Sequence, residues 1–312
     1  MKEIRGIIPA LLSPFTSHDE FDDQAFTWLC RNCLEGGVHA LMLGGSLGEF
    51  PSLTEAERLA EIRIAVREAN SRVPVIAGAS SPSTAEAIRL AKGAKEEGAD
   101  VALVLPPYYY QASEEAVFNH YDSIAHAVDI PLVIYNFPGT TKVSLSPPFV
   151  ARLARIDGIV GIKNSVDSLI HLREIIRLTR EIKSFAVIPG MEDYLIPGLL
   201  LGARGSVSGF SNMIPRTMVR IYNDLVAGDV KKAANEFNDT VIPLKALAPP
   251  PDPISALKIG ASLVGPVGTK VRLPVLDAPP GTRESMEKLM AGLNLLPTAR
   301  AERLSTGAYL RS

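Results

Sequence analysis

Short apolar segments recur through the first two thirds of this chain, and a helical pattern follows each of them. Glycine, proline or polar residues bound every segment, as expected for parallel strands that are buried on both faces. The segments are 7–12, 40–43, 75–77, 101–105, 132–135, 159–162, 185–188 and 205–208. Because eight strand–helix units close into a ring, the sequence predicts an α/β fold, a (β/α)8 TIM barrel.

The helical patterns between the segments carry their own start signals. Thr54-x-x-Glu57 and Ser83-x-x-Glu86 each fit a capping box, in which side chains satisfy the free backbone N–H groups of a first turn. They predict helices over 54–70 and 83–97, the first with apolar residues at 56, 59, 62, 65, 66 and 69. A doubly wound sheet is the alternative, and the absence of Gly-x-Gly-x-x-Gly after the first segment disfavours it.

The chain continues for about 100 residues after the eighth segment, which is too long for one closing helix. Apolar patterns predict further helices over 229–247, 254–264 and 282–293, with a proline-rich break at 248–253. We therefore expect a catalytic barrel over 1–225 and a C-terminal helical extension over 226–312. The last dozen residues show no clear pattern.

Composition narrows the class of protein. The 312 residues are 46% hydrophobic and 21% charged, with a net charge of −2, as in ordinary folded enzymes. The absence of a Lys/Arg block argues against a nucleic-acid partner. Because neither a signal-peptide core nor a membrane-length apolar run occurs, we expect no membrane association and a cytoplasmic location.

The two cysteines, Cys30 and Cys33, have a spacing that could indicate half a zinc site or a redox pair. They lie in an amphipathic stretch, and no second pair or Cys/His cluster completes four ligands. We interpret them as half-buried helix thiols. The five histidines also lack a metal-binding spacing, so the sequence predicts no metal and no cofactor.

Barrel enzymes carry their reactive groups at the carboxyl ends of the strands. Lys163 directly follows the apolar run 158–162, where burial would favour a neutral amine that attacks carbonyls. Glycines at 44, 45 and 48 could turn backbone N–H groups toward a small anion. Tyr135, one strand away, could transfer protons. A lysine paired with an acid, an ordinary glycine turn and a packing tyrosine remain open alternatives.

Three motifs at these strand ends resemble those of the dihydrodipicolinate synthase / N-acetylneuraminate lyase family of class I pyruvate-dependent aldolases. Gly45-Ser-Leu-Gly-Glu49 is similar to the family's G-x-x-G-E loop. Tyr135-Asn-Phe-Pro138 resembles its Y-N-x-P strand, and Gly161-Ile-Lys163 its G-x-K site. The resemblance extends from about residue 6 to residue 274, in order and at barrel spacing.

The resemblance implies a role for each residue. Lys163 would form a Schiff base with pyruvate, Tyr135 would act as acid and base, and Ser46 would relay protons. Backbone N–H groups of Ser46 and Leu47, in the loop with Gly45 and Gly48, would hold the carboxylate. Tyr109 resembles the tyrosine that family members insert from a neighbouring subunit, which implies a homotetramer built as a dimer of dimers.

Two departures bear on the substrate. Leu47 stands where many members have a second hydroxyl, and Thr140 stands where dihydrodipicolinate synthases have a carboxylate-binding arginine. The remaining predicted substrate-binding residues are Ser165, Gly190, Glu192, Asp193 and Val207. Polar acceptors without that arginine favour an aldolase or dehydratase acting on a 2-keto-3-deoxy sugar acid. Dihydrodipicolinate synthase, 4-hydroxy-2-oxoglutarate aldolase (from Gly48-Glu-Phe-Pro51) and a non-catalytic binding or regulatory barrel are the alternatives.

Overall fold

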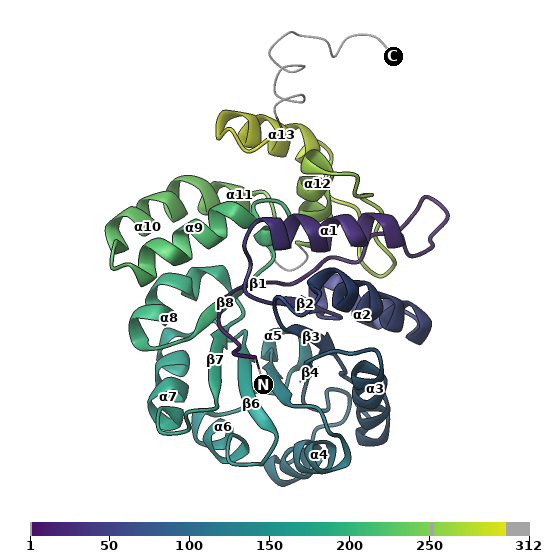
Figure 1. Cartoon of the computed structure of the whole chain (residues 1–312), viewed down its shortest axis with the longest axis vertical. Coiled ribbons are helices and arrows are strands. Elements are labelled where there is room, and N and C mark those ends of the chain that lie inside the picture. Colours follow the sequence, from purple (N-terminus) through teal and green to yellow (C-terminus); the bar gives the residue numbers. More distant parts are fainter. Residues whose placement is uncertain (1, 250–252, 298–312) are drawn as a thin grey trace.

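The computed structural model describes residues 2–249 and 253–297, and within these ranges a ring of eight parallel strands forms the centre (Figure 1). The strands are β1 (Gly6–Pro9), β2 (Leu41–Leu43), β3 (Val75–Gly78), β4 (Val101–Val104), β5 (Leu132–Asn136), β6 (Ile159–Asn164), β7 (Ala186–Pro189) and β8 (Gly205–Ser208). Strands β2 to β7 pair in sequence order, and β1 pairs with β8. Each lies within a few residues of its predicted segment.

Two contacts close the ring. A bridge joins Ala10, directly after β1, to Met42 of β2, where Leu11 N donates to Met42 O at 2.8 Å. On the other side, Arg204 N donates to Val187 O at 3.0 Å, which ties β8 to β7. The closed order of parallel strands confirms the predicted (β/α)8 barrel.

Helices surround the strands (Figure 1). They are α1 (Asp23–Glu35), α2 (Glu55–Ala69), α3 (Thr84–Glu96), α4 (Glu114–Ala127), α6 (Pro147–Leu153), α7 (Leu169–Thr179), α8 (Leu195–Leu201) and α9 (Pro215–Val226), with a short α5 (Pro138–Thr141) after β5. Side chains alternate along the strands: Ile7 packs among the outer helices, whereas Ile8 packs inside the barrel. The core therefore has two layers, one inside the ring and one outside it.

The predicted start of α2 is confirmed, because Thr54 N donates to Glu57 Oε2 at 2.8 Å while Glu57 N donates to Thr54 Oγ1 at 3.3 Å. At α3 only half of the predicted capping box forms. The Ser83 hydroxyl accepts from Glu86 N at 3.4 Å, but the Glu86 carboxylate binds Arg89 instead of reaching back. An arginine one turn along the helix competes better for that carboxylate than a backbone N–H does.

The predicted C-terminal helices are also present. They are α10 (Val230–Glu236), α11 (Ile242–Ala246), α12 (Ile254–Val264) and α13 (Thr282–Gly292), and a π-helical turn at Phe237–Val241 joins the first two. Figure 1 shows α12 beside α1, with α13 beyond it. The division at residue 225 stays a prediction, and the patternless tail lies outside the described residues. In the part of the chain that the structure describes, no helix is long and apolar enough to cross a membrane.

Candidate active site

Lys163 and Tyr135 meet inside the barrel. The alternation along β5 places Val133 and Tyr135 in the interior cluster, and Tyr135 is the register partner of Lys163 on β6. Both side chains are buried, and Lys163 Nζ lies 4.0 Å from the centroid of the Tyr135 ring. The amine and the phenol therefore share one buried space at the carboxyl ends of adjacent strands.

The loop after β2 reaches the same space. It consists of two 3₁₀ turns, Ser46–Gly48 and Phe50–Ser52, with Glu49 between them in a left-handed conformation at φ 49°. The Ser46 Oγ is 3.2 Å from the Tyr135 hydroxyl oxygen. A methyl group added at Gly45 would lie 3.9 Å from Lys163 Nζ. Ser46, Tyr135 and Lys163 thus form one continuous group.

Gly190, directly after β7, lies against the other predicted side chains. A methyl group there would come within 2.1 Å of Ser165 Oγ and 3.2 Å of Lys163 Cε, so any larger residue would have to displace the Ser165 side chain. Val207 on β8 is buried in the interior cluster. Gly190 and Ser165 therefore lie beside Lys163, and Val207 lies in the same interior cluster as Tyr135.

Glu192, in the turn after β7, reaches the end of β8. Its Oε1 accepts a hydrogen bond from Gly209 N at 2.6 Å, and the Ser208 hydroxyl also bonds the carboxylate. Burial raises the pKa of Glu192, which these hydrogen bonds partly oppose. A methyl group at Gly209 would lie 2.7 Å from Leu47 Cδ1 and 3.7 Å from Glu192 Oε1. Glu192 and Leu47 therefore flank the same glycine.

Three predicted residues turn toward solvent instead. Tyr109 is 79% exposed and packs edge-on against Tyr110, with 5.1 Å between ring centroids. Thr140 on α5 is exposed. Asp193 is exposed too, and its carboxylate forms an ion pair with Lys245 of α11. The structure does not bring these three side chains to Lys163 within one chain.

The sequence reasoning missed a buried ion pair beneath the loop. Lys258 Nζ of α12 lies 2.6 Å from Glu49 Oε1, and both side chains are fully buried. Lys258 also donates to Lys270 O at 2.6 Å, and Arg272 N donates to Glu49 Oε2 at 2.8 Å. Burial lowers the pKa of Lys258, and Glu49 opposes that shift. The available signal was one charged residue within the apolar run 254–264.

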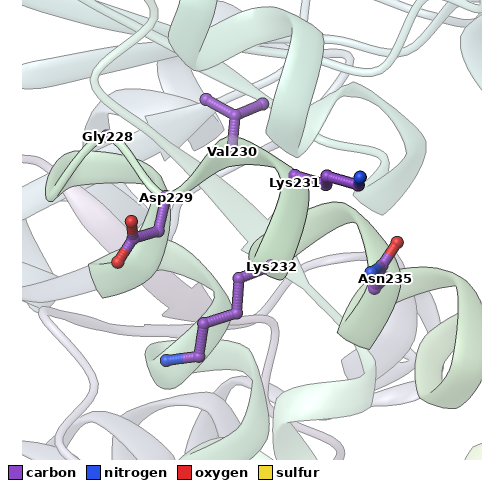
Figure 2. A pocket seen from close by; sticks show the side chains of 6 residues that line it. All are labelled: Gly228, Asp229, Val230, Lys231, Lys232 and Asn235. Atoms are coloured by element: carbon purple, nitrogen blue, oxygen red, sulfur yellow. The ribbon is translucent and has the colours of Figure 1, made fainter.

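Other candidate binding sites in the described residues have fewer features that indicate a ligand. A surface hollow of about 570 Å³ lies at the turn between α9 and α10. Figure 2 shows the residues that line it, which are Gly228, Asp229, Val230, Lys231, Lys232 and Asn235. Its Lys232 already binds Asp224 at 2.9 Å. No described His, Cys, Asp or Glu side chains form a group of three that could hold a metal ion. Cys30 and Cys33 are buried free thiols on α1.

Comparison with known proteins finds matches along nearly the whole chain. Residues 3–293 match the model of the Dihydrodipicolinate synthetase family. A 4-hydroxy-tetrahydrodipicolinate synthase of Syntrophus aciditrophicus is 36% identical over 293 residues, which are 94% of this chain and 99% of the relative. The probable 2-dehydro-3-deoxy-D-pentonate aldolase YjhH of Escherichia coli is 35% identical over 301 residues, 95% of this chain and 100% of that protein.

Solved structures show the same similarity. YagE, a prophage protein of the dihydrodipicolinic acid synthase family from Escherichia coli, crystallised in complex with pyruvate, superposes with a TM-score of 0.87. It is 33% identical, and the match covers 93% of this chain and 99% of that one. A monomeric dihydrodipicolinate synthase variant gives a TM-score of 0.89 at 32% identity, covering 94% and 98%.

Proposed function

Because this chain belongs to the dihydrodipicolinate synthetase family of lyases, we propose that it forms a Schiff base between Lys163 and pyruvate or a 2-keto-3-deoxy sugar acid. One observation carries the proposal: Lys163 Nζ lies buried, 4.0 Å from the Tyr135 ring centroid, beside a phenol that contacts the Ser46 hydroxyl. A buried amine next to a proton carrier is what imine chemistry requires.

The reaction follows from these positions. The neutral amine of Lys163 attacks C2 of the 2-oxo acid, and Tyr135 protonates the carbinolamine oxygen, which leaves as water. The resulting iminium withdraws electrons, so C3 loses a proton to the Tyr135 phenolate left by that step, and an enamine forms. The enamine attacks an aldehyde, Ser46 relays a proton to the new alkoxide through Tyr135, and water then releases the product from Lys163. Aldol cleavage is the reverse.

The loop after β2 would hold the substrate carboxylate. Gly48 N and Glu49 N close the 3₁₀ turn by donating to Gly45 O and Ser46 O, at 3.1 Å each. The earlier N–H groups of such a turn, here those of Ser46 and Leu47, have no partner within it. Two neighbouring backbone donors suit a small anion. The similar YagE was crystallised with pyruvate, which supports pyruvate as the substrate that this loop would receive.

For the second substrate we propose a hydroxylated, uncharged aldehyde. Thr140 offers no cation to a second carboxylate, and the half-buried carboxyl of Glu192 would accept hydrogen bonds from substrate hydroxyls. The similarity to YjhH agrees with a sugar-acid substrate. If C4 carries the leaving hydroxyl, the same enamine expels water, and the enzyme is a dehydratase.

Two other lyase activities remain as alternatives. The relatives named 4-hydroxy-tetrahydrodipicolinate synthase favour condensation of pyruvate with aspartate semialdehyde. The Gly48–Pro51 motif favours 4-hydroxy-2-oxoglutarate aldolase. A non-catalytic barrel is disfavoured, because Lys163, Tyr135 and Ser46 are all present and adjacent.

We also propose a cytoplasmic homotetramer. Tyr109 and Tyr110, after β4, are 79% and 78% exposed, which is unusual for two adjacent aromatic rings. Ile170 on α7 and Leu200 on α8, two helices in contact, are 66% and 64% exposed. A second copy would cover such side chains, and Tyr109 would then enter the partner's site. Sedimentation of the wild type and of Tyr109→Ala tests this assembly.

Borohydride reduction in the presence of pyruvate tests the chemistry. Mass spectrometry should find a pyruvate adduct on Lys163 of the wild type and no adduct in the Lys163→Met variant. The control variant Lys183→Met, which changes an exposed lysine before β7, should still carry the adduct on Lys163. A folded wild type that forms no adduct would refute the proposal. Turnover with glyceraldehyde, glycolaldehyde, glyoxylate and aspartate semialdehyde then identifies the second substrate, and fast use of aspartate semialdehyde alone would refute the sugar-acid assignment.

A further inference from the structure

A buried polar connection runs beneath the loop after β2. Ser13, which follows β1, is fully buried, and its hydroxyl oxygen lies 2.7 Å from Gly48 O. The same Oγ contacts Oε1 of Glu61 on α2. A methyl group at Gly48 would lie 3.0 Å from Ser13 Oγ and 3.1 Å from Leu11 O, so the loop packs tightly here. Ser13 therefore joins α2 to the loop.

The number of hydrogens decides the direction of these bonds. A backbone carbonyl and an ionised carboxylate only accept, and a serine hydroxyl has one hydrogen to donate. If Glu61 were ionised, one of the two contacts of Ser13 would join two acceptors without a hydrogen. If Glu61 is protonated, it donates to Ser13 Oγ, and Ser13 donates to Gly48 O. Only the protonated form satisfies both contacts.

The surroundings of Glu61 agree with a neutral acid. The residue is 1% exposed, and nowhere in the described ranges does a hydrogen-bond partner reach its Oε2. Burial is the main cause that raises the pKa of Glu61 to about 8. Its charged and titratable neighbours come from three helices: Arg58 and Lys258 lower this pKa, Glu57 raises it, and Cys30 lies near on α1.

Neither cation bonds directly to the buried carboxyl. Arg58 donates to Phe50 O at 2.7 Å while its Nε is buried without a hydrogen-bond partner, and Lys258 is paired with Glu49 at 2.6 Å. Among the described residues, no ion pair or hydrogen bond joins either cation to Glu61. A buried carboxyl with one free oxygen and no cation of its own favours the protonated state.

We propose that protonated Glu61 is a positioning residue for the pyruvate site, acting through Ser13 on the loop that carries Ser46 and Leu47. Loss of its proton would draw the Ser13 hydroxyl to the carboxylate. The Gly48 carbonyl would then be buried without its donor, and the loop would shift from the substrate carboxylate. The proposal rests on the proposed pyruvate chemistry and assigns Glu61 no contact with substrate.

The pH dependence of imine formation tests this role in the full-length enzyme. The pyruvate concentration that half-saturates borohydride trapping on Lys163 is measured from pH 6 to pH 9 for wild type, Glu61→Gln and the exposed control Glu55→Gln. One pH unit above a pKa of about 8, roughly a tenth of Glu61 stays protonated, so half-saturation should need about tenfold more pyruvate.

The variants separate this effect from the titration of other groups. A glutamine amide donates to Ser13 at every pH, so Glu61→Gln should match wild type at pH 7 and lack the tenfold rise. Glu55→Gln should follow wild type throughout, because Glu55 is exposed on the first turn of α2. Ser13→Ala should bind pyruvate more weakly at every pH, since Gly48 O loses its donor.

Infrared spectroscopy tests the proton without pyruvate. Wild type at pH 7 should show a neutral carboxyl band that weakens as the pH passes 8 and is missing from Glu61→Gln. The proposal would be overturned if wild type and Glu61→Gln showed the same carboxyl spectrum at pH 7. It would also be overturned if Glu61→Gln lost pyruvate binding at high pH as wild type does. If wild type trapped no pyruvate at any pH, the proposed function would fail, while the band would still decide the state of Glu61.

Discussion

Replacement of Arg272 by methionine should weaken the contact between the C-terminal extension and the barrel and so destabilise the fold. The Arg272 guanidinium donates two hydrogen bonds to the Glu57 carboxylate, at 2.8 and 2.6 Å, and a third to Ser52 O at 2.9 Å. It also lies 4.1 Å from the centroid of the Phe15 ring. Methionine keeps the apolar stem over that ring but loses the charge and the hydrogen bonds.

The pKa of Glu57 gives the magnitude. Its bond to Arg272 is the main cause that lowers this pKa from 4.5 to about 2. At about 1.4 kcal/mol per pH unit, such a shift corresponds to roughly 3 kcal/mol. Solvent reaches both side chains, which are 17% and 14% exposed, so screening reduces the expected loss to about 2 kcal/mol.

The sign of the pH dependence follows from the direction of the shift. Glu57 has a lower pKa in the folded than in the unfolded state, so its stabilisation is complete above pH 4.5 and is lost as the pH falls toward 2. The difference in stability between wild type and Arg272→Met should therefore shrink from about 2 kcal/mol at pH 7 to below about 1 kcal/mol at pH 3.

Urea unfolding of wild type, Arg272→Met, Glu57→Gln and the double variant measures these differences. Glutamine at position 57 can still cap Thr54, so it removes mainly the ion pair. The two losses should not add, because both substitutions break the same contact. The free energy of unfolding of the double variant should lie within about 0.5 kcal/mol of that of the less stable single variant. Additive losses, or a wild-type advantage that persists at pH 3, would refute the assigned pairing.

Three further outcomes are expected. Gly190→Ala should lower kcat/KM at least about tenfold while circular dichroism stays unchanged, because the methyl group would displace Ser165; unchanged kinetics would count against the assigned site. Lys258→Met should destabilise the fold by about 3–5 kcal/mol in urea, because it leaves Glu49 buried without a counterion, and Glu49→Gln in the same chain should recover part of that loss. Tyr135→Phe keeps the ring and removes only the hydroxyl, so kcat should fall about 10²–10³-fold while borohydride still traps the imine slowly; wild-type turnover would exclude this tyrosine as the acid.

The barrel was predictable because its signals are local. A short apolar run bounded by turn residues specifies a buried strand whatever the rest of the chain does, and eight such runs occur in order. The pairing of Tyr135 with Lys163 follows in turn, since both lie at the ends of consecutive strands that the fold makes neighbours. Strand order therefore predicted that these two residues are neighbours, whereas their proposed roles came from the family resemblance.

What could not be predicted depends on contacts between distant parts of the chain. Apolar periodicity gave α2 a buried face that includes Ala56, but Ala56 is exposed and the buried face contains Glu61. Asp193 looked available to substrate, yet Lys245, 52 residues later, takes its carboxylate. The sequence does not show which charged residues form ion pairs, because the two partners do not recur at a fixed spacing as the apolar residues of a helix or strand do.

The ion pair between Glu49 and Lys258 joins two residues that are synthesised far apart in time. All eight strands leave the ribosome before α12 does, so a nascent chain holds the β2 loop with Glu49 still lacking its counterion. Chains that end before α12 would lack Lys258, and Glu49 in the loop after β2 would have no counterion. They would also lack the apolar side chains that α12 adds to the core outside the ring, such as Leu257 and Leu263.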